Sequence, residues 1–389
     1  MYTVTLPYSK SIAARLLAVR LMSGTAASTE LDKALARPQC VDIEVMKAAV
    51  SKLYSSDGEV VIDLKDSGTA KHLLTALCAC RPGLTSTLTM SERLGERPFG
   101  ALPQMLNILT DAKIDVRPRE IRIVGGRFIG TDMQLQAEDT ISSQYITALM
   151  LIAPSGKTPL RMSVNAQQSS LPYIKMTAAL MRKCGVNVTF NQPYSKIEVS
   201  PGKYHIPTPD MLERDWSAAA FFYEYAFVTG KQIDIEGLTP PDKSVQGDAV
   251  IAEIFGAADT RVELNMRNTP DLVPPVAVGC ALKGVPFRLS GISHLRYKES
   301  DRREALRTII ECFGIQVHVG SDYIEMSRKQ TPKRPSGVVP CFNDHRIAMS
   351  LVPAMALFPD IKLDNPGCVD KSFPDFWNQI KYLKVGSIN

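Results

Sequence analysis

A four-part pattern recurs along the chain and limits the folds that it can adopt. Apolar residues at helical spacing run into a short alternating stretch in residues 101–116, 172–188 and 304–317. A second alternating stretch follows each copy, starting at Ile121, Lys196 and Asp322. The unit is helix, strand, turn, strand, and residues 250–266 are a looser copy of it. The repeat predicts several similar α/β modules in which each helix shields one sheet.

Glycines mark where two of these helices should end. Gly185 and Gly314 follow the last apolar position of their helices, and glycine adopts the left-handed C-terminal conformation most easily. A larger seam lies in residues 204–220, where Pro207 and Pro209 interrupt regular structure. Asp215 or Ser217 would then cap a new helix, so a domain boundary is expected near residue 214.

Composition excludes several classes of protein. Hydrophobic residues make up 45% and charged residues 22% of the 389 residues, which is typical of a soluble protein of two domains. No apolar run approaches the roughly 20 residues of a membrane span. Lys10, Arg15 and Arg20 interrupt the N-terminal apolar stretch, which argues against a signal peptide and favours the cytoplasm.

Cysteine, histidine and charge patterns point the same way. The eight cysteines form no CxxC pair and are expected to be reduced thiols, and the five histidines have no metal-ligand spacing. We therefore expect no bound metal. The net charge of +5 is not concentrated in a basic tract, so we do not expect nucleic acid as a partner. The cations stand singly at predicted helix starts, which favours small anions as ligands.

Helix N-termini are therefore the candidate chemical sites, because their free N–H groups and partial positive charge bind anions. In residues 8–24, Ser9 or Ser11 can cap a helix that places Ser11 and Arg15 on one face and ends at Gly24. In residues 66–83, Gly68 lets a ligand approach the backbone. Arg97 precedes Pro98, which suits a first helical position, so Arg97 is expected at a helix entrance.

Further predicted helix starts carry hydroxyls or charges. Asp301 and Glu304 have capping-box spacing, and Asp344 can cap the helix that holds Arg346. The remaining candidates are Ser142, Ser143, Gln144, Ser170, Tyr173, Asp271, Lys298, Glu299, Arg302 and Lys371. Each could be an ordinary cap or surface charge, but together they predict an anion-binding cleft with carboxylates left over for proton transfer.

The order of these motifs resembles the 5-enolpyruvylshikimate-3-phosphate synthase family. The matching segments are SKSxxxR, GTA, ERPxG, SSQ, SxPYI, DxSAAA, QGD, PD, YKESDR, NDHRxAM and KSFPDF, and they span nearly the whole chain. The resemblance implies a two-domain inside-out α/β fold, each domain built of three βαβαββ repeats, with a cleft between the domains. Residues 8–214 would be an inserted domain, and residues 1–7 would join 215–389.

The same resemblance implies an activity and roles for single residues. The family transfers the enolpyruvyl group of phosphoenolpyruvate to the 5-hydroxyl of shikimate 3-phosphate, without a cofactor, and is the target of glyphosate. Shikimate 3-phosphate would be held by Lys10, Ser11, Arg15, Ser142, Ser143, Gln144, Ser170, Tyr173, Asp271, His294 and Lys298. Phosphoenolpyruvate would be held by Lys10, Gly68, Arg97, Gln144, Arg302, Arg346 and Lys371. Asp271 would be the base, with Glu299, Lys371 and Lys10 as further catalytic groups, most simply in a monomer.

The chain departs from the family pattern in a few places. His72 stands where an arginine is usual, with Lys71 and Arg93 as candidates to compensate, and His294 replaces a common asparagine. Two alternatives remain: UDP-N-acetylglucosamine enolpyruvyl transferase, and a catalytically weak anion-binding homologue. The first usually has Lys-Asn where this chain has Lys10-Ser11 and a cysteine that is missing near residues 96–100.

Overall fold

The computed structural model describes residues 2–25, 29–97, 99–130, 132–134, 143–164, 170–192 and 194–383. The chain divides into two compact units. Unit 1 contains Met1–Ser9 and Glu213–Asn389, and unit 2 contains Lys10–Leu212. The chain passes from unit 1 to unit 2 and back, so unit 2 is a continuous insertion in unit 1.

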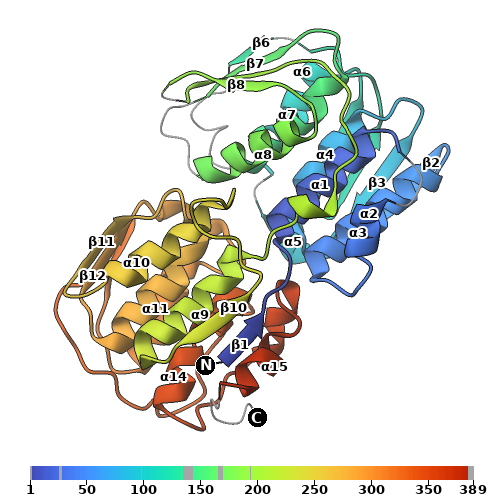
Figure 1. Cartoon of the computed structure of the whole chain (residues 1–389). Coiled ribbons are helices and arrows are strands. Elements are labelled where there is room, and N and C mark those ends of the chain that lie inside the picture. Colours follow the sequence, from blue (N-terminus) through green and yellow to red (C-terminus); the bar gives the residue numbers. More distant parts are fainter. Residues whose placement is uncertain are drawn as a thin grey trace. The chain divides into compact units, whose positions relative to one another are not determined.

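Unit 2 contains two complete βαβαββ modules (Figure 1). The first comprises β2 (Glu59–Asp63), α4 (Gly68–Ala79), β3 (Thr85–Thr89), α6 (Leu102–Leu109), β4 (Lys113–Arg117) and β5 (Glu120–Val124). The second comprises β6 (Asp132–Gln134), α7 (Ser143–Ile152), β7 (Leu160–Ser163), α8 (Leu171–Lys183), β8 (Val188–Phe190) and β9 (Lys196–Val199). The other helices of this unit are α1 (Lys10–Met22), α2 (Glu30–Ala34), α3 (Val41–Ser55) and α5 (Glu92–Glu96).

Unit 1 contains a third complete module of the same kind. It comprises β11 (Val262–Asn265), α11 (Val273–Lys283), β12 (Phe287–Ser290), α12 (Arg302–Cys312), β13 (His318–Val319) and β14 (Tyr323–Met326). The unit also has the strands β1 (Tyr2–Thr5) and β10 (Ile233–Glu236), which pair in parallel, and the helices α9 (Trp216–Thr229), α10 (Ile251–Ala257), α13 (His345–Ser350), α14 (Val352–Leu357) and α15 (Phe376–Lys381).

The three modules share one sheet topology. Their strand orders are β2-β3-β5-β4, β6-β7-β9-β8 and β11-β12-β14-β13. In each, the first two strands are parallel, and the last two form an antiparallel hairpin beside the second strand. Three segments far apart in the sequence therefore form the same local structure.

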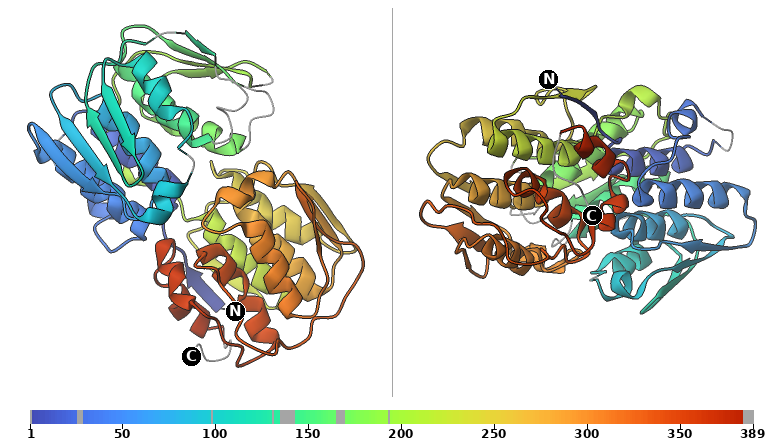
Figure 2. Two further views of the ribbon diagram at one scale, coloured as in Figure 1. Left: turned by 180° about the vertical axis from the view of Figure 1, so that it is seen from behind. Right: turned by 90° about the horizontal axis from the view of Figure 1, so that it is seen from below.

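Helices fill the centre of each unit and the sheets lie outside them (Figures 1 and 2). In α11 every residue from Val273 to Leu282 is buried, and the helix packs against α9, α12, α13 and β12. A helix that is apolar all round is stable only inside a core. The strands instead alternate, as in β2, where Val60 and Ile62 are buried and their neighbours are exposed, so one face of each sheet is solvated.

The repeat predicted from the sequence is confirmed in its three main copies, whose hairpin strands are β4 with β5, β8 with β9 and β13 with β14. Gly185 and Gly314 have φ of 86° and 71°, as their helix ends require. The looser copy in residues 250–266 is wrong, because β11 pairs in parallel with β12 and opens a module instead of forming a hairpin. Asp215 caps α9 through Ser217 N and Ala218 N.

Among the residues that the structure describes, no helix combines the length and the apolar character that crossing a membrane requires.

Candidate functional site

A buried arginine organises the charged cluster of unit 1. Arg302, the first residue of α12, is 1% exposed and donates to three carboxylates. Its Nε lies 2.9 Å from Asp344 Oδ2, its Nη1 lies 2.9 Å from Asp271 Oδ1, and its Nη2 lies 2.9 Å from Glu299 Oε2. Burial alone would lower the pKa of Arg302, but the three carboxylates raise it, so the side chain stays charged.

Two more cations complete this cluster. Arg346 Nη2 donates to Asp271 Oδ2 at 2.9 Å, and Lys371 Nζ donates to Glu299 Oε1 at 3.0 Å. Both oxygens of Asp271 and both oxygens of Glu299 therefore accept from cations. The structure thus brings together the candidates Asp271, Glu299, Arg302, Arg346 and Lys371.

Local structure explains how these side chains are placed. Asp344 caps α13 by accepting from Arg346 N at 3.0 Å, as the sequence predicts, and its other oxygen accepts from Arg302. Asp301 caps α12 through Arg303 N, but no reciprocal bond from Glu304 completes the expected capping box. Asp271 lies in a 3₁₀ turn before α11, and Lys371 ends the 3₁₀ turn Pro366–Lys371.

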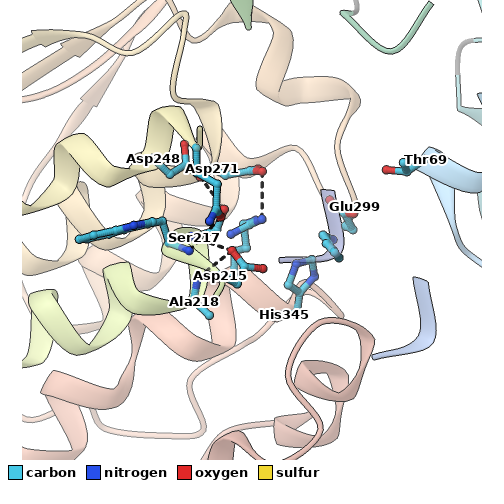
Figure 3. A network of polar contacts seen from close by, with 12 residues as sticks. Thr69, Asp215, Ser217, Ala218, Asp248, Asp271, Glu299 and His345 are labelled. Atoms are coloured by element: carbon cyan, nitrogen blue, oxygen red, sulfur yellow. Dashed lines mark hydrogen bonds and ion pairs between the residues drawn. The ribbon is translucent and has the colours of Figure 1, made fainter. Parts of the chain in front are cut away.

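Sequence reasoning missed a carboxylate behind Asp271. Asp248 is 4% exposed and accepts a hydrogen bond from Ser217 Oγ in the first turn of α9 (Figure 3). Burial and the charge of Asp271 raise the pKa of Asp248. The QGD motif contains this residue, so the motif was the available signal.

His294 lies within the 3₁₀ turn Ser293–Tyr297 of unit 1, and Lys298 directly follows this turn. Burial and the charge of Lys298 lower the pKa of His294 to about 4, so the imidazole is neutral at pH 7. A neutral histidine can still donate one hydrogen bond, as an asparagine side chain does.

In unit 2, Arg97 covers the first turn of α4. Ser67 caps this helix by accepting from Ala70 N. A Cβ added to Gly68, the first helical residue, would lie 3.2–3.3 Å from the Arg97 guanidinium. Gln144 of α7 donates to Thr69 Oγ1 at 3.3 Å, so Gly68, Arg97 and Gln144 gather at one helix start.

The sequence predicted that Arg97 would lie at the entrance to a helix, and this prediction is wrong. Arg97 follows α5 as the C-cap residue, and the next helix, α6, begins at Leu102. The side chain nevertheless reaches the start of α4 because residues 91–97 turn back toward it, with Ser91 N bonded to Lys65 O at 3.1 Å. The helix-start geometry therefore comes from a tertiary contact.

His72 and Lys71 lie one turn further along α4, and both are buried. His72 Nδ1 lies 2.7 Å from Gly68 O, and its ring packs against Phe99 and Tyr145. Burial lowers the pKa of His72 to about 3, so it supplies no charge in place of the usual arginine. Burial, assisted by the charge of Arg97, lowers the pKa of Lys71 to about 8. Arg93 lies on the exposed helix α5 and pairs with Glu96 at 3.4 Å.

A second group of unit 2 surrounds Arg15, which is 3% exposed. Its guanidinium donates to Ser11 O at 2.8 Å and to Thr177 Oγ1 at 2.8 Å, and it lies 5.8 Å from the centre of the Tyr173 ring. Burial lowers the pKa of Arg15 to about 10. Lys10, at the start of α1, pairs with Asp42 of α3 at 2.9 Å. No local pattern revealed Asp42 or Thr177 as partners.

Three predicted hydroxyl residues, Ser142, Ser143 and Ser170, differ in how far the structure describes them. Ser170 has a left-handed backbone with φ of 59° and precedes α8 without capping it through its side chain. Ser143 is the first residue of α7, whereas Ser142 lies outside the described residues. No group of three or more metal-ligating side chains occurs in the described part of the chain.

Comparisons with known proteins agree with one another. The family model described as EPSP synthase (3-phosphoshikimate 1-carboxyvinyltransferase) matches residues 3–380. A 3-phosphoshikimate 1-carboxyvinyltransferase of Bacteroides fragilis is 34% identical, covering 99% of this chain and 95% of that protein. The enzyme of the same name from Methanosphaerula palustris is 31% identical over 82% of this chain and 78% of its own length.

A solved structure titled EPSP synthase from Acinetobacter baumannii has the same fold. It superposes with a TM-score of 0.73 at 19% identity and covers 99% of this chain and 96% of that one. The predicted two-domain inside-out α/β architecture is thereby confirmed.

Proposed function

Because the chain belongs to the EPSP synthase family, we propose that it transfers the enolpyruvyl group of phosphoenolpyruvate to the 5-hydroxyl of shikimate 3-phosphate and releases phosphate. The reaction belongs to the shikimate pathway of aromatic amino acid biosynthesis. The observation that supports it most directly is the convergence of Asp271, Glu299, Arg302, Arg346 and Lys371 in unit 1.

The proposal divides substrate binding between the two units. In unit 2, shikimate 3-phosphate is held by Lys10, Ser11, Arg15, Ser142, Ser143, Gln144, Ser170 and Tyr173. Phosphoenolpyruvate is held there by Lys10, Gly68, Arg97 and Gln144. In unit 1, Asp271, His294 and Lys298 contact shikimate 3-phosphate, whereas Arg302, Arg346 and Lys371 bind phosphoenolpyruvate. Guanidinium groups suit this role because they bind carboxylate and phosphate oxygens through paired hydrogen bonds.

Proton transfer follows from the carboxylates of unit 1. Glu299 with Lys371 delivers a proton to the methylene carbon of phosphoenolpyruvate. The neighbouring carbon, C2, then develops cationic character. The 5-hydroxyl attacks C2 while Asp271 takes its proton, and a tetrahedral adduct forms. The methyl carbon of the adduct then returns a proton to Glu299 with Lys371, the C2–O bond to phosphate breaks, and the enolpyruvyl ether and free phosphate result. Positioned acids and bases of this kind contribute about 10²–10⁴-fold to a rate.

Substrate binding is expected to rearrange the ion pairs. Asp271 accepts from Arg302 on one oxygen and from Arg346 on the other, and these two cations stabilise the carboxylate and make it a weaker base. The anionic groups of phosphoenolpyruvate compete for the same guanidinium groups. We propose that this exchange makes Asp271 a stronger base when phosphoenolpyruvate is bound, because the guanidinium groups then interact with the substrate as well.

Phosphate release from purified protein tests the function. Release that requires both substrates, and that Lys371→Ala abolishes while the fold is retained, is the expected result. Absence of release from the folded wild-type protein would overturn the proposal, and UDP-N-acetylglucosamine would then be tried as the acceptor. In the active enzyme, glyphosate is expected to compete with phosphoenolpyruvate; non-competitive inhibition would contradict the assigned binding residues.

We propose that the protein is a monomer located in the cytoplasm. One chain carries every assigned residue, so we propose a monomer, which sedimentation velocity would check. All eight cysteines are free thiols, which agrees with a reducing compartment such as the cytoplasm.

A further inference from the structure

Lys71 of α4 is a buried lysine whose ammonium group contacts the end of α5 and Phe99. It is 3% exposed, and its Nζ donates to Leu94 O at 3.1 Å and to Arg97 O at 3.3 Å. The same ammonium lies 4.7 Å from the centre of the Phe99 ring. Two carbonyls and an aromatic face thus surround the charge, which offsets the cost of burying it.

All three contacts belong to the segment that ends α5 and carries Arg97. The last carbonyls of a helix lack partners within the helix and have partial negative charge. A lysine from another helix, α4, satisfies two such carbonyls at the end of α5. Lys71 therefore ties Leu94, Arg97 and Phe99 to α4.

This attachment has a consequence at the start of α4. Gly68 lies three residues before Lys71, and the Arg97 guanidinium covers it. One turn of α4 thus contacts Arg97 twice: Gly68 meets its side chain, and Lys71 holds its main-chain carbonyl. Movement of that carbonyl would displace the guanidinium from the helix start.

His72, the next residue of α4, also contacts Gly68 and Phe99, but it carries no charge. His72 bonds to Gly68 O and packs on Phe99 and Tyr145, so its ring fills the space beneath the segment. Lys71 is the only residue of α4 that is charged at neutral pH, because His72 is neutral and the rest of the helix is uncharged.

We propose that Lys71 is a positioning residue for the reaction: it anchors Leu94, Arg97 and Phe99 so that the Arg97 side chain meets phosphoenolpyruvate at the start of α4. Lys71 itself does not touch the substrate. The inference rests on the proposed function, because it concerns how one of the assigned binding residues is held.

Steady-state kinetics of Lys71→Met tests the inference. Methionine has a side chain of similar length to lysine but no charge, so the KM for phosphoenolpyruvate should rise about tenfold. The kcat and the KM for shikimate 3-phosphate should stay within about threefold of the wild-type values. Lys71→Arg, which keeps a donor and a charge, should recover most of the loss. Lys52→Met is the matched control, because Lys52 also donates to a carbonyl, Val61 O, but on the exposed surface.

A double-mutant cycle with Arg97→Lys distinguishes positioning from a general loss of structure. If Lys71 acts through Arg97, adding Lys71→Met to Arg97→Lys should change the KM for phosphoenolpyruvate by less than about twofold. Full additivity, or an unchanged KM in Lys71→Met, would overturn the inference. Lys71→Gln replaces Lys71→Met if the latter does not fold. An inactive wild-type protein would instead overturn the proposed function itself.

Discussion

Arg302 shows how one side chain sets the geometry of several others. Three carboxylates from separate segments converge on its guanidinium, which is buried and planar. The donors of a guanidinium are fixed in direction, so Asp271, Glu299 and Asp344 are held at fixed angles to one another. Lysine at this position could not reproduce the arrangement.

Glu224 is a buried carboxyl outside the proposed site. It lies in α9 with 0% exposure, and its Cγ lies 3.0 Å from a Cβ added to Gly279 of α11. Among the residues that the structure describes, neither of its oxygens has a hydrogen-bond partner. Burial raises its pKa well above the ordinary value, so the folded protein retains a proton that the unfolded chain releases. Stability should therefore fall as pH rises above the ordinary glutamate pKa.

Glu224→Gln should remove this dependence. At pH 8 the variant is expected to be more stable than the wild type by about 1–3 kcal/mol, with little difference near pH 4. Urea unfolding at both pH values measures it, with the exposed Glu253→Gln as control. A variant equally or less stable at pH 8 would contradict the neutral buried carboxyl.

Gly68→Ala tests the contact between α4 and Arg97. The added methyl would lie 3.2–3.3 Å from the guanidinium, so Arg97 must shift by a few tenths of an ångström. We expect the KM for phosphoenolpyruvate to rise about tenfold, because misplaced binding groups lose affinity steeply, with the KM for shikimate 3-phosphate nearly unchanged. Equal effects on both KM values would argue against the assigned role of Gly68.

At the scale of single elements, the first turn of α9 is capped by one side chain, that of Asp215. Asp215 accepts from Ser217 N and Ala218 N, and α9 then runs buried through unit 1 beside α11. The capped first turn also carries Ser217, which bonds to Asp248. Capping and the polar network behind Asp271 are therefore linked through one helical turn (Figure 3).

Replacing this cap should weaken the fold measurably. Asp215→Ala is expected to lose about 1–2 kcal/mol in the free energy of unfolding, whereas Asp215→Asn, which can still accept, should lose less. Thermal and urea unfolding provide the measurement, with Ser91→Ala at the short helix α5 as comparison. Equal stability of Asp215→Ala and the wild type would show that the N-cap bonds contribute nothing.

For the whole molecule, we expect that loss of the proposed base, Asp271, lowers turnover without abolishing substrate binding. Asp271→Ala removes the proposed base but leaves the unit 2 binding residues, so both substrates should still raise the melting temperature together. Its kcat should fall about 10²–10⁴-fold. Near-normal turnover would remove Asp271 from the mechanism, and a lost thermal shift would mean that its role is mainly in binding or folding.

The sequence predicted the repeating modules because helical and strand periods are local properties of a chain. Gly185, Gly314, Asp215 and Asp344 were also readable, since caps and left-handed helix ends need particular residues at fixed offsets. Residues 250–266 were misread because a lone strand has the same period whether its neighbour is parallel or antiparallel.

What the sequence by itself determined was therefore the module pattern, the helix starts and the ordered motifs that identify the family. Only the tertiary structure decided which groups meet: Lys10 with Asp42, Lys71 with the carbonyls of residues 94 and 97, and Arg302 with its three carboxylates. These partners lie between 3 and 42 positions apart, and local spacing does not specify contacts across elements. Charge pairing in the core depends on the packing of helices, which is settled only when the whole unit folds.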